Sequence, residues 1–164
     1  MIGVIFFGMI LLFLDFLSKA YVFHLHPFNV CSAGICSSEP LFSLFGIDFM
    51  ISFATNRGAA WGLFANFQTV LMTIRILIVL GLLAYLFFIN DKRGAIIPLV
   101  LIISGAAGNI VDFFLYGYVI DFFDFNLWGY AFPVFNLADT WITLGVIWLF
   151  LLTFFVKKEQ TNGY

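Results

Sequence analysis

The sequence predicts an all-α integral membrane protein with four transmembrane helices and a small extracytoplasmic β-sheet lying on the membrane surface. The 164 residues are 63% hydrophobic and 21% aromatic, with a mean hydropathy of +1.10, whereas a soluble domain is about 45–50% apolar. Crossing the hydrocarbon takes about 20 apolar residues, and in lipid a helix satisfies its own backbone. Four segments qualify, at about 2–22, 70–89, 95–115 and 137–156.

The first span begins directly after Met1. No Lys or Arg precedes the apolar run 2–14, and no small-residue cleavage site follows it, so we expect a retained helix rather than a cleaved signal. Asp15 and Lys19 are four residues apart near its end. An ion pair on one helix face is the ordinary interpretation of that spacing.

Residues 23–69 form a long loop, and between Ile47 and Asn56 its apolar residues alternate with others. Ile47, Phe49, Ile51 and Phe53 share one face of this stretch, and a period of two predicts a strand. We expect residues 42–45 to pair with it across a turn at Gly46. The sheet would carry the segment 56–62 at its far end, while residues 116–136 form the second outer loop.

Polar residues in the first loop also allow a metal site or a disulfide. The residues are His24, His26, Cys31 and Cys36. Their spacing fits no standard zinc pattern, and a Cys31–Cys36 disulfide is the better hypothesis if the outer space is oxidising. We therefore predict no metal and no cofactor.

The basic residues predict the orientation of the spans. Lys92 and Arg93 lie between the second and third spans, and Lys157 and Lys158 follow the fourth. With four spans these sites share one side with the N-terminus, and the positive-inside rule makes that side cytoplasmic. Lys19 and Arg75, near the outer ends of their spans, are expected to snorkel outward. The net charge of −2 does not indicate the basic surface that a nucleic-acid-binding protein needs.

Carboxylates and amides gather in the last third of the chain, although only 10% of all residues are charged. Asn109 and Asp112 share a helix face and must face the bundle interior, because a charge inside a span costs about 2.5–3.5 kcal/mol. Two interpretations of Asn109 and Asp112 remain open: polar contacts that hold helices together, and a functional role. Asn136 and Asp139 fit a helix cap, with or without a chemical role. The remaining acidic residues are Asp121, which has apolar neighbours, and Asp124; one of the two can be an ordinary solvated loop carboxylate.

Asp121 and Asp139 are predicted to meet at the outer rim, because the third and fourth spans are antiparallel neighbours. Two carboxyls in contact share a proton across the neutral range. One can then deprotonate a water while the other protonates a carbonyl oxygen, which is the chemistry of an aspartic peptidase. An ion-coupled transporter also suits intramembrane Asp and Asn, but the acidic groups lie at one rim and the chain has no internal duplication. A presenilin-type protease lacks its G-x-G-D motif here, and an accessory membrane protein without activity is the remaining alternative.

Five motifs in order resemble those of the lipoprotein signal peptidases (signal peptidase II), the bacterial inner-membrane aspartic peptidases. The resemblance covers nearly the whole chain, 1–164, as a single membrane peptidase domain. The motifs are L-D-F-L-S-K at 14–19, T-N-R-G-A-A-W-G at 55–62, G-A-A-G-N-I-V-D at 105–112, G-Y-V-I-D-F at 117–122 and F-P-V-F-N-L-A-D at 132–139. One departure is Phe113, where the family usually has Arg.

The resemblance implies a function and a set of site residues. Asp121 and Asp139 would be the catalytic dyad of a hydrolase that uses no metal and is the target of globomycin. Its substrate would be a prolipoprotein carrying diacylglycerol on its Cys, cut on the N-terminal side of that Cys. Residues expected to support the site and the substrate are Asp15, Asn56, Gly58, Asn109, Asp112 and Asn136. We expect a monomer in the bacterial inner membrane, with both termini cytoplasmic and the active site at the extracytoplasmic face.

Overall fold

The structure is a computed structural model that describes residues 2–25, 35–36, 40–57, 67–90 and 93–161. Its four long helices are all long and apolar enough to cross a membrane, which confirms the predicted fold class. They are α1 (Ile2–Leu25), α2 (Gln68–Ala84), α3 (Ile96–Tyr116) and α4 (Leu137–Thr161). A π-helical turn, η3 (Tyr85–Ile89), continues α2, and a short 3-10 turn, η4 (Arg93–Ala95), leads into α3.

Helix α3 is the centre of the bundle. Half of its most apolar 18-residue window is buried, against 17% or less in the other three spans. Small residues on α3 allow this: a Cβ added to Gly105 would overlap the carbonyl oxygen of Ala138, and one added to Gly108 would lie 2.5 Å from Asp15 Oδ2. These small residues bring α1 and α4 close to the same segment of α3.

Five strands among the described residues form an antiparallel sheet in the order β1-β3-β4-β5, with β2 also paired to β3. They are β1 (Ile35–Cys36), β2 (Phe42–Leu44), β3 (Ile47–Asn56), β4 (Val119–Leu127) and β5 (Tyr130–Ala131). The predicted strand at 47–56 and its partner across Gly46 are confirmed, and Gly46 has the left-handed φ of +80° that this turn requires.

Strand β4 was not predicted, because residues 116–136 were interpreted as a loop. It pairs with β3 from Ile47↔Leu127 to Asn56↔Val119. Its sequence, V-I-D-F-F-D-F-N-L, shows no alternation of polar and apolar residues, since both of its faces are largely buried near the bundle. A strand buried on both faces loses the period of two by which strands are recognised.

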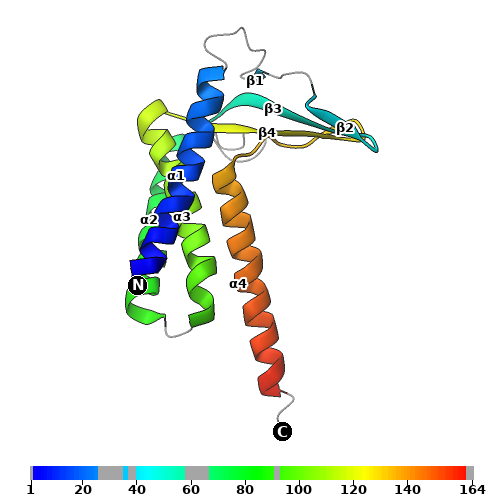
Figure 1. Ribbon diagram of the computed structural model, residues 1–164. Helices are drawn as coiled ribbons and strands as arrows, with labels where there is room; N and C mark the ends of the chain where they lie inside the picture. The colour runs from blue at the N-terminus through cyan, green and yellow to red at the C-terminus, as the bar shows by residue number, and fades with distance from the viewer. Residues whose placement is uncertain (1, 26–34, 37–39, 58–66, 91–92, 162–164) are drawn as a thin grey trace.

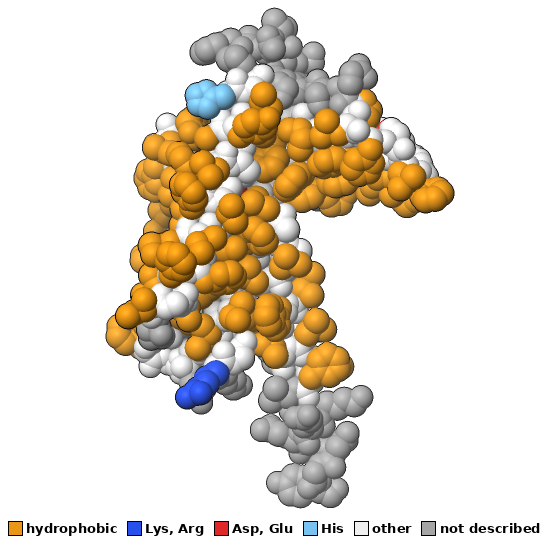
Figure 2. All heavy atoms as spheres, in the orientation of Figure 1, with side chains coloured by type: hydrophobic (Ala, Val, Ile, Leu, Met, Phe, Trp, Pro, Cys, Tyr) orange, Lys and Arg blue, Asp and Glu red, His pale blue; other side chains and the backbone are white. Residues whose placement is uncertain are grey.

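The sheet lies across one end of the helix bundle (Figure 1). The start of α1, the turns η3 and η4, and the end of α4 all lie at the opposite end (Figure 1), as the four-span topology requires. Hydrophobic side chains cover the helices and the helix-facing side of the sheet, while the basic side chain visible on this face lies at the end away from the sheet (Figure 2). Arg93 is exposed at that end of α3.

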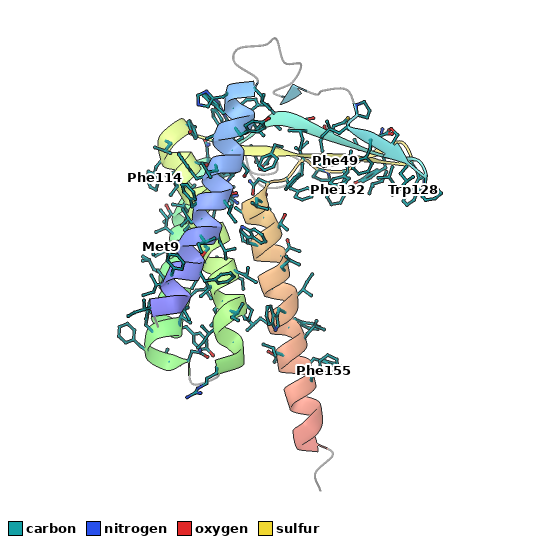
Figure 3. All side chains as sticks on the ribbon, in the orientation of Figure 1. Met9, Phe49, Phe114, Trp128, Phe132 and Phe155 are labelled. Carbon is teal, nitrogen blue, oxygen red and sulfur yellow. The ribbon has the colours of Figure 1, made fainter. Side chains whose placement is uncertain are left out.

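Aromatic rings form a row across the helix-facing side of the sheet. Ring centroids lie 5.3 Å apart for Phe42 and Phe49, and 4.9 Å apart for Phe49 and Phe125. The row continues to Phe135 at 5.9 Å, and from there to Phe132 at 6.0 Å. Figure 3 shows Phe49 and Phe132 along the sheet and Trp128 at its far tip. The sheet therefore presents an apolar surface beside the exposed apolar face of α4.

Candidate active site

The N-terminus of α4 is closed by a reciprocal cap between Asn136 and Asp139. The Asp139 backbone N–H donates to Asn136 Oδ1 at 2.8 Å, and the Asn136 N–H donates to Asp139 Oδ2 at 3.3 Å. Two backbone donors of the first turn are satisfied in this way. The predicted cap is confirmed, and it holds the half-buried Asp139 carboxylate where the helix dipole favours an anion.

Asp121 lies on β4 and is only 3% exposed. Its carboxylate accepts hydrogen bonds from Asn136 Nδ2 at 2.6 Å and from Asn56 Nδ2 at 3.0 Å. Burial, followed by the nearby charge of Asp139, raises the pKa of Asp121 to about 7, although the two asparagines and Lys19 act in the opposite direction. Asp121 is therefore a carboxyl that holds its proton close to neutral pH.

Two asparagines connect the two carboxyls. Asn136 donates to Asp121, and Asn109 Nδ2 donates to Asp139 Oδ1 at 2.8 Å. The amides also meet each other, because Asn136 Nδ2 lies 3.1 Å from Asn109 Oδ1. Each carboxyl thus has a fixed amide donor, and the side chains of β4, α3 and α4 form one continuous hydrogen-bonded network.

A buried ion cluster lies directly behind this network. The Lys19 ammonium contacts Asp15 Oδ2 at 2.7 Å and Asp112 Oδ2 at 2.9 Å, and it donates to Asn109 Oδ1 at 3.0 Å. The ion pair predicted between Asp15 and Lys19 is confirmed. The expectation that Lys19 snorkels outward is wrong: the residue is 1% exposed, because two carboxylates and an amide satisfy its three donors inside the bundle.

The two carboxylates of the cluster each bind the chain just before a candidate catalytic residue. Asp15 Oδ1 accepts from the backbone N–H of Ala138 at 2.8 Å, and Asp112 Oδ2 accepts from that of Ile120 at 3.2 Å. Ala138 precedes Asp139 and Ile120 precedes Asp121. Helices α1 and α3 therefore fix the backbone at both carboxyls. Asp112 makes the polar contacts between helices that its structural interpretation expected, and its functional role stays a prediction.

Comparison with known proteins identifies the family. The sequence model described as Signal peptidase (SPase) II matches residues 7–155. The chain belongs to the signal peptidase II family. It is 44% identical over 119 residues to a lipoprotein signal peptidase of Chlamydia pneumoniae, covering 70% of this chain and 68% of that protein. It is also 34% identical over 151 residues to one of Chlamydia trachomatis serovar D, covering 90% and 88%.

Solved structures are similar over nearly the whole signal peptidase II chain. A bacterial membrane enzyme determined by the in meso method at 2.3 Å resolution has a TM-score of 0.74 and 30% identity, covering 99% of this chain and 92% of that one. A second, determined at 1.9 Å, has a TM-score of 0.72 and 29% identity, covering 92% of both chains. Four spanning helices and these relatives make the protein a multi-pass bacterial membrane protein.

The structure brings together seven of the eight site residues named from the signal peptidase II motifs. Gly58 lies outside the described residues. The hydrogen-bonded network and the ion cluster behind it contain the other seven: Asp15, Asn56, Asn109, Asp112, Asp121, Asn136 and Asp139.

Lys19 belongs to the same cluster, whereas it was expected from the sequence to reach the surface. Its spacing of four residues from Asp15, within an apolar span, was the signal for a buried ion pair. It contacts Asp112, the residue just before the half-buried Phe113 that stands in place of the usual Arg.

Two further predictions concern residues around the site. Asp124 is not a solvated loop carboxylate: it is 8% exposed on β4 and accepts from Ser52 Oγ at 2.6 Å. Among the described residues no group of three or more His, Cys, Asp or Glu side chains can hold a metal ion. His26 and Cys31 lie outside the described residues, so the proposed Cys31–Cys36 disulfide remains a prediction.

Proposed function

We propose that this protein is an aspartic endopeptidase that removes the signal peptide from diacylglyceryl-modified prolipoproteins by cutting N-terminal to the lipidated Cys. Asp121 and Asp139 are its catalytic dyad. The observation that carries the proposal is that Asn136 joins the two carboxyls, donating to Asp121 Oδ1 while capping the helix turn that holds Asp139. Membership of the signal peptidase II family supports the substrate class.

The environments of the two carboxyls assign their roles. Asp121 is buried and its pKa is raised to about 7, so it carries the shared proton and acts as the general acid. Asp139 is half-buried at the N-terminus of α4, where an anion is favoured, so it acts as the general base.

Cleavage then follows in two stages. The Asp139 carboxylate takes a proton from a water molecule, and the water oxygen bonds to the scissile carbonyl carbon as Asp121 protonates the carbonyl oxygen. The tetrahedral intermediate then collapses: one of its two hydroxyls returns a proton to Asp121, the C–N bond breaks, and the proton held by Asp139 passes to the leaving amine of the lipidated Cys. The new carboxyl end leaves with the signal peptide, and one proton remains shared by the dyad.

A lipid-modified substrate can reach the proposed site from the bilayer. Acyl chains on the substrate keep it in the bilayer, and the aromatic row of the sheet continues the apolar surface of the helices (Figures 2 and 3). We propose that the acyl chains and the signal helix lie along the sheet and α4. We propose that the site lies at the extracytoplasmic face of the bacterial inner membrane, with the termini and exposed Arg93 on the cytoplasmic side, as the positive-inside rule predicts.

A reconstituted cleavage assay tests the proposal. Detergent-solubilised protein mixed with a diacylglyceryl prolipoprotein should release the signal peptide and leave a product beginning with the lipidated Cys, unaffected by metal chelators and blocked by globomycin. Asp121→Asn and Asp139→Asn should each lower the rate by roughly 10²–10⁴-fold, the range for losing a general acid or base.

Asp48→Asn is the matched control, because Asp48 lies on β3 outside the hydrogen-bonded network, where its carboxylate accepts an exposed hydrogen bond from the Ser43 hydroxyl. Full turnover by either dyad variant, or loss of turnover on chelation, would refute the aspartic mechanism.

A further inference from the structure

Asn109 on α3 lies between a buried cation and the proposed general base. Its Nδ2 donates to Asp139 Oδ1 at 2.8 Å, and its Oδ1 accepts from Lys19 Nζ at 3.0 Å. The proposed reaction uses Asp139 directly, whereas Lys19 takes no part in it. One end of the Asn109 amide is a donor and the other is an acceptor. A half-turn of the amide would therefore present an acceptor to the Asp139 carboxylate and break this hydrogen bond.

A second donor near Asn109 Oδ1 is only partly available to it. Asn136 Nδ2 lies 3.1 Å from this oxygen. The same nitrogen lies 2.6 Å from Asp121 Oδ1 and 3.2 Å from the Ile120 carbonyl oxygen. An amide nitrogen has two hydrogens, so these three acceptors cannot all be satisfied at once. Among the described residues, Lys19 is therefore the donor to Asn109 Oδ1 whose hydrogen no other acceptor shares.

The Lys19 ammonium also occupies two carboxylates at the same place. It contacts Asp15 Oδ2 at 2.7 Å and Asp112 Oδ2 at 2.9 Å, and all three side chains are buried. Its three hydrogens thus match three acceptors. With the cation present, the Asn109 oxygen faces a positive charge. Without the cation, the same oxygen would face two buried carboxylates, and each would compete with Asp139 for the Asn109 N–H groups, because a buried carboxylate without a donor is costly.

We propose that Lys19 is a positioning residue: by occupying the two buried carboxylates, it keeps the Asn109 N–H groups turned toward Asp139. The inference rests on the proposed function for its effect on the reaction, but not for its geometry. The Asn109 amide and the Asn136 backbone N–H each hold one oxygen of the Asp139 carboxylate. These two bonds fix the direction in which the carboxylate can take a proton from water, so losing one of them should slow the chemical step more than it weakens substrate binding.

Cleavage by Lys19→Met tests the effect on the reaction. Since the substitution also destabilises the protein, the rate is divided by the folded fraction measured on the same sample. The corrected kcat should fall roughly 10–100-fold, the range for losing one hydrogen bond to a charged group, while KM stays close to the wild-type value. Arg93→Met, which removes an exposed cation at the other end of the bundle, should keep the wild-type kcat. A folded Lys19→Met protein with the wild-type kcat would overturn the inference.

Nuclear magnetic resonance of the asparagine side chains gives a readout that needs no turnover. In protein made with isotopically labelled asparagine, the Asn109 amide signals are assigned by their loss in Asn109→Ala. Asp139→Ala should shift these signals in the wild-type background, because Asp139 is the acceptor of the amide. In the Lys19→Met background the same substitution should leave them nearly unmoved. Equal shifts in the two backgrounds would overturn the inference.

A triple variant keeps the inference testable if Lys19→Met does not fold. Lys19→Met/Asp15→Asn/Asp112→Asn removes the cation together with both competing carboxylates. Each introduced amide oxygen can still accept from the backbone N–H of Ala138 or Ile120, as the carboxylates do. The variant therefore contains no buried carboxylate that has lost its cation, and it should fold more readily than Lys19→Met alone.

The Asn109 amide should again face Asp139 in this triple variant, because no anion remains beside its oxygen. Adding Asp139→Ala should then shift the Asn109 signals as it does in the wild-type background. Loss of that response would show that Lys19 acts on Asn109 by another route than occupying the carboxylates, and would overturn the inference.

The outcomes separate this inference from the proposed function. Wild-type protein that does not cleave a diacylglyceryl prolipoprotein, but whose Asn109 signals depend on Lys19 as described, would refute the peptidase reaction and leave the geometry intact. Cleavage by the wild type, together with Asn109 signals that do not depend on Lys19, would refute the role of Lys19 alone.

Discussion

The ammonium of Lys19 lies 2.9 Å from a carboxylate oxygen of Asp112, so a cation from α1 meets an anion from α3 in the interior of the bundle. Both side chains are 3% exposed or less. The same cation contacts Asp15, and the two carboxylates fix the backbone before Asp121 and Asp139. A single buried lysine therefore stabilises both sides of the proposed site.

Replacing Lys19 with Met should destabilise the protein strongly. The substitution leaves two buried carboxylates without their cation, and removing one partner of a buried ion pair costs about 3–5 kcal/mol. Unfolding of the purified protein in a denaturing detergent titration would measure the change. Arg93→Met, which removes an exposed cation at the opposite end, should alter stability by about 0.5 kcal/mol or less. Equal effects of the two variants would contradict the structural role of Lys19.

Cleavage should decline as the pH rises above about 7. The pKa of Asp121 is raised to about 7, and the general acid must be protonated to act, so kcat/KM should fall about tenfold per pH unit beyond that value. A profile measured from pH 5 to 9 with a short lipidated substrate would show the decline. A value of kcat/KM that rises between pH 7 and pH 9 would show that Asp121 is not the general acid.

Asp121→Asn should stabilise the folded protein at pH 8 more than at pH 4. The folded-state pKa of about 7 lies above the unfolded value of 3.8, so the folded state binds the proton more tightly, and wild-type stability falls as the pH rises from about 3.8 to about 7. The Asn variant lacks that titration. Thermal unfolding of the wild type and of Asp121→Asn at both pH values would measure the effect. A stability difference between the two proteins that is the same at pH 4 and pH 8 would argue against a raised pKa of Asp121.

Gly105→Ala should separate α3 from α4 and weaken catalysis. The new Cβ would overlap the Ala138 carbonyl oxygen and lie 2.9 Å from Ile142 Cγ1, and such overpacking costs about 1–3 kcal/mol. The displacement would also loosen the bond between Asn109 and Asp139. Gly81→Ala is the matched control on α2, since nothing lies within 4 Å of its added Cβ, and it should be neutral or stabilise by up to about 1 kcal/mol. Unfolding and cleavage assays on both variants distinguish them.

Gly46→Ala should disturb the far tip of the sheet more than Gly129→Ala. Both glycines have a left-handed φ, +80° and +86°, which costs an alanine about 1–2 kcal/mol. Only at Gly46 would the added Cβ also meet a neighbour, Trp128 Cδ1 at 2.7 Å, where the indole N–H donates to the Phe45 carbonyl at 2.9 Å. Hydrogen exchange of the β2 and β4 amides would report the difference; similar exchange in both variants would show that backbone strain alone matters.

Local sequence features predicted much of this architecture. Runs of about 20 apolar residues predicted the four spans, and a period of two predicted β3, because both signals are contained within the segments that form them. The spacing of Asn136 and Asp139 predicted the cap at the start of α4. Each of these signals lies within the segment that it predicts.

Only the tertiary structure decided the contacts between distant segments. Lys19 donates to Asn109 across 90 positions, and Asp15 accepts from Ala138 across 123. A lysine near the end of a span reaches the interface by default, and it turns inward only because two carboxylates from different helices converge on it. Strand β4 likewise depends on β3, since its backbone is satisfied across strands and its own sequence shows no period of two. The sequence determined the helices and the polar residues, while packing determined which groups share a hydrogen bond, a cation or a register, because these depend on distances that no local period encodes.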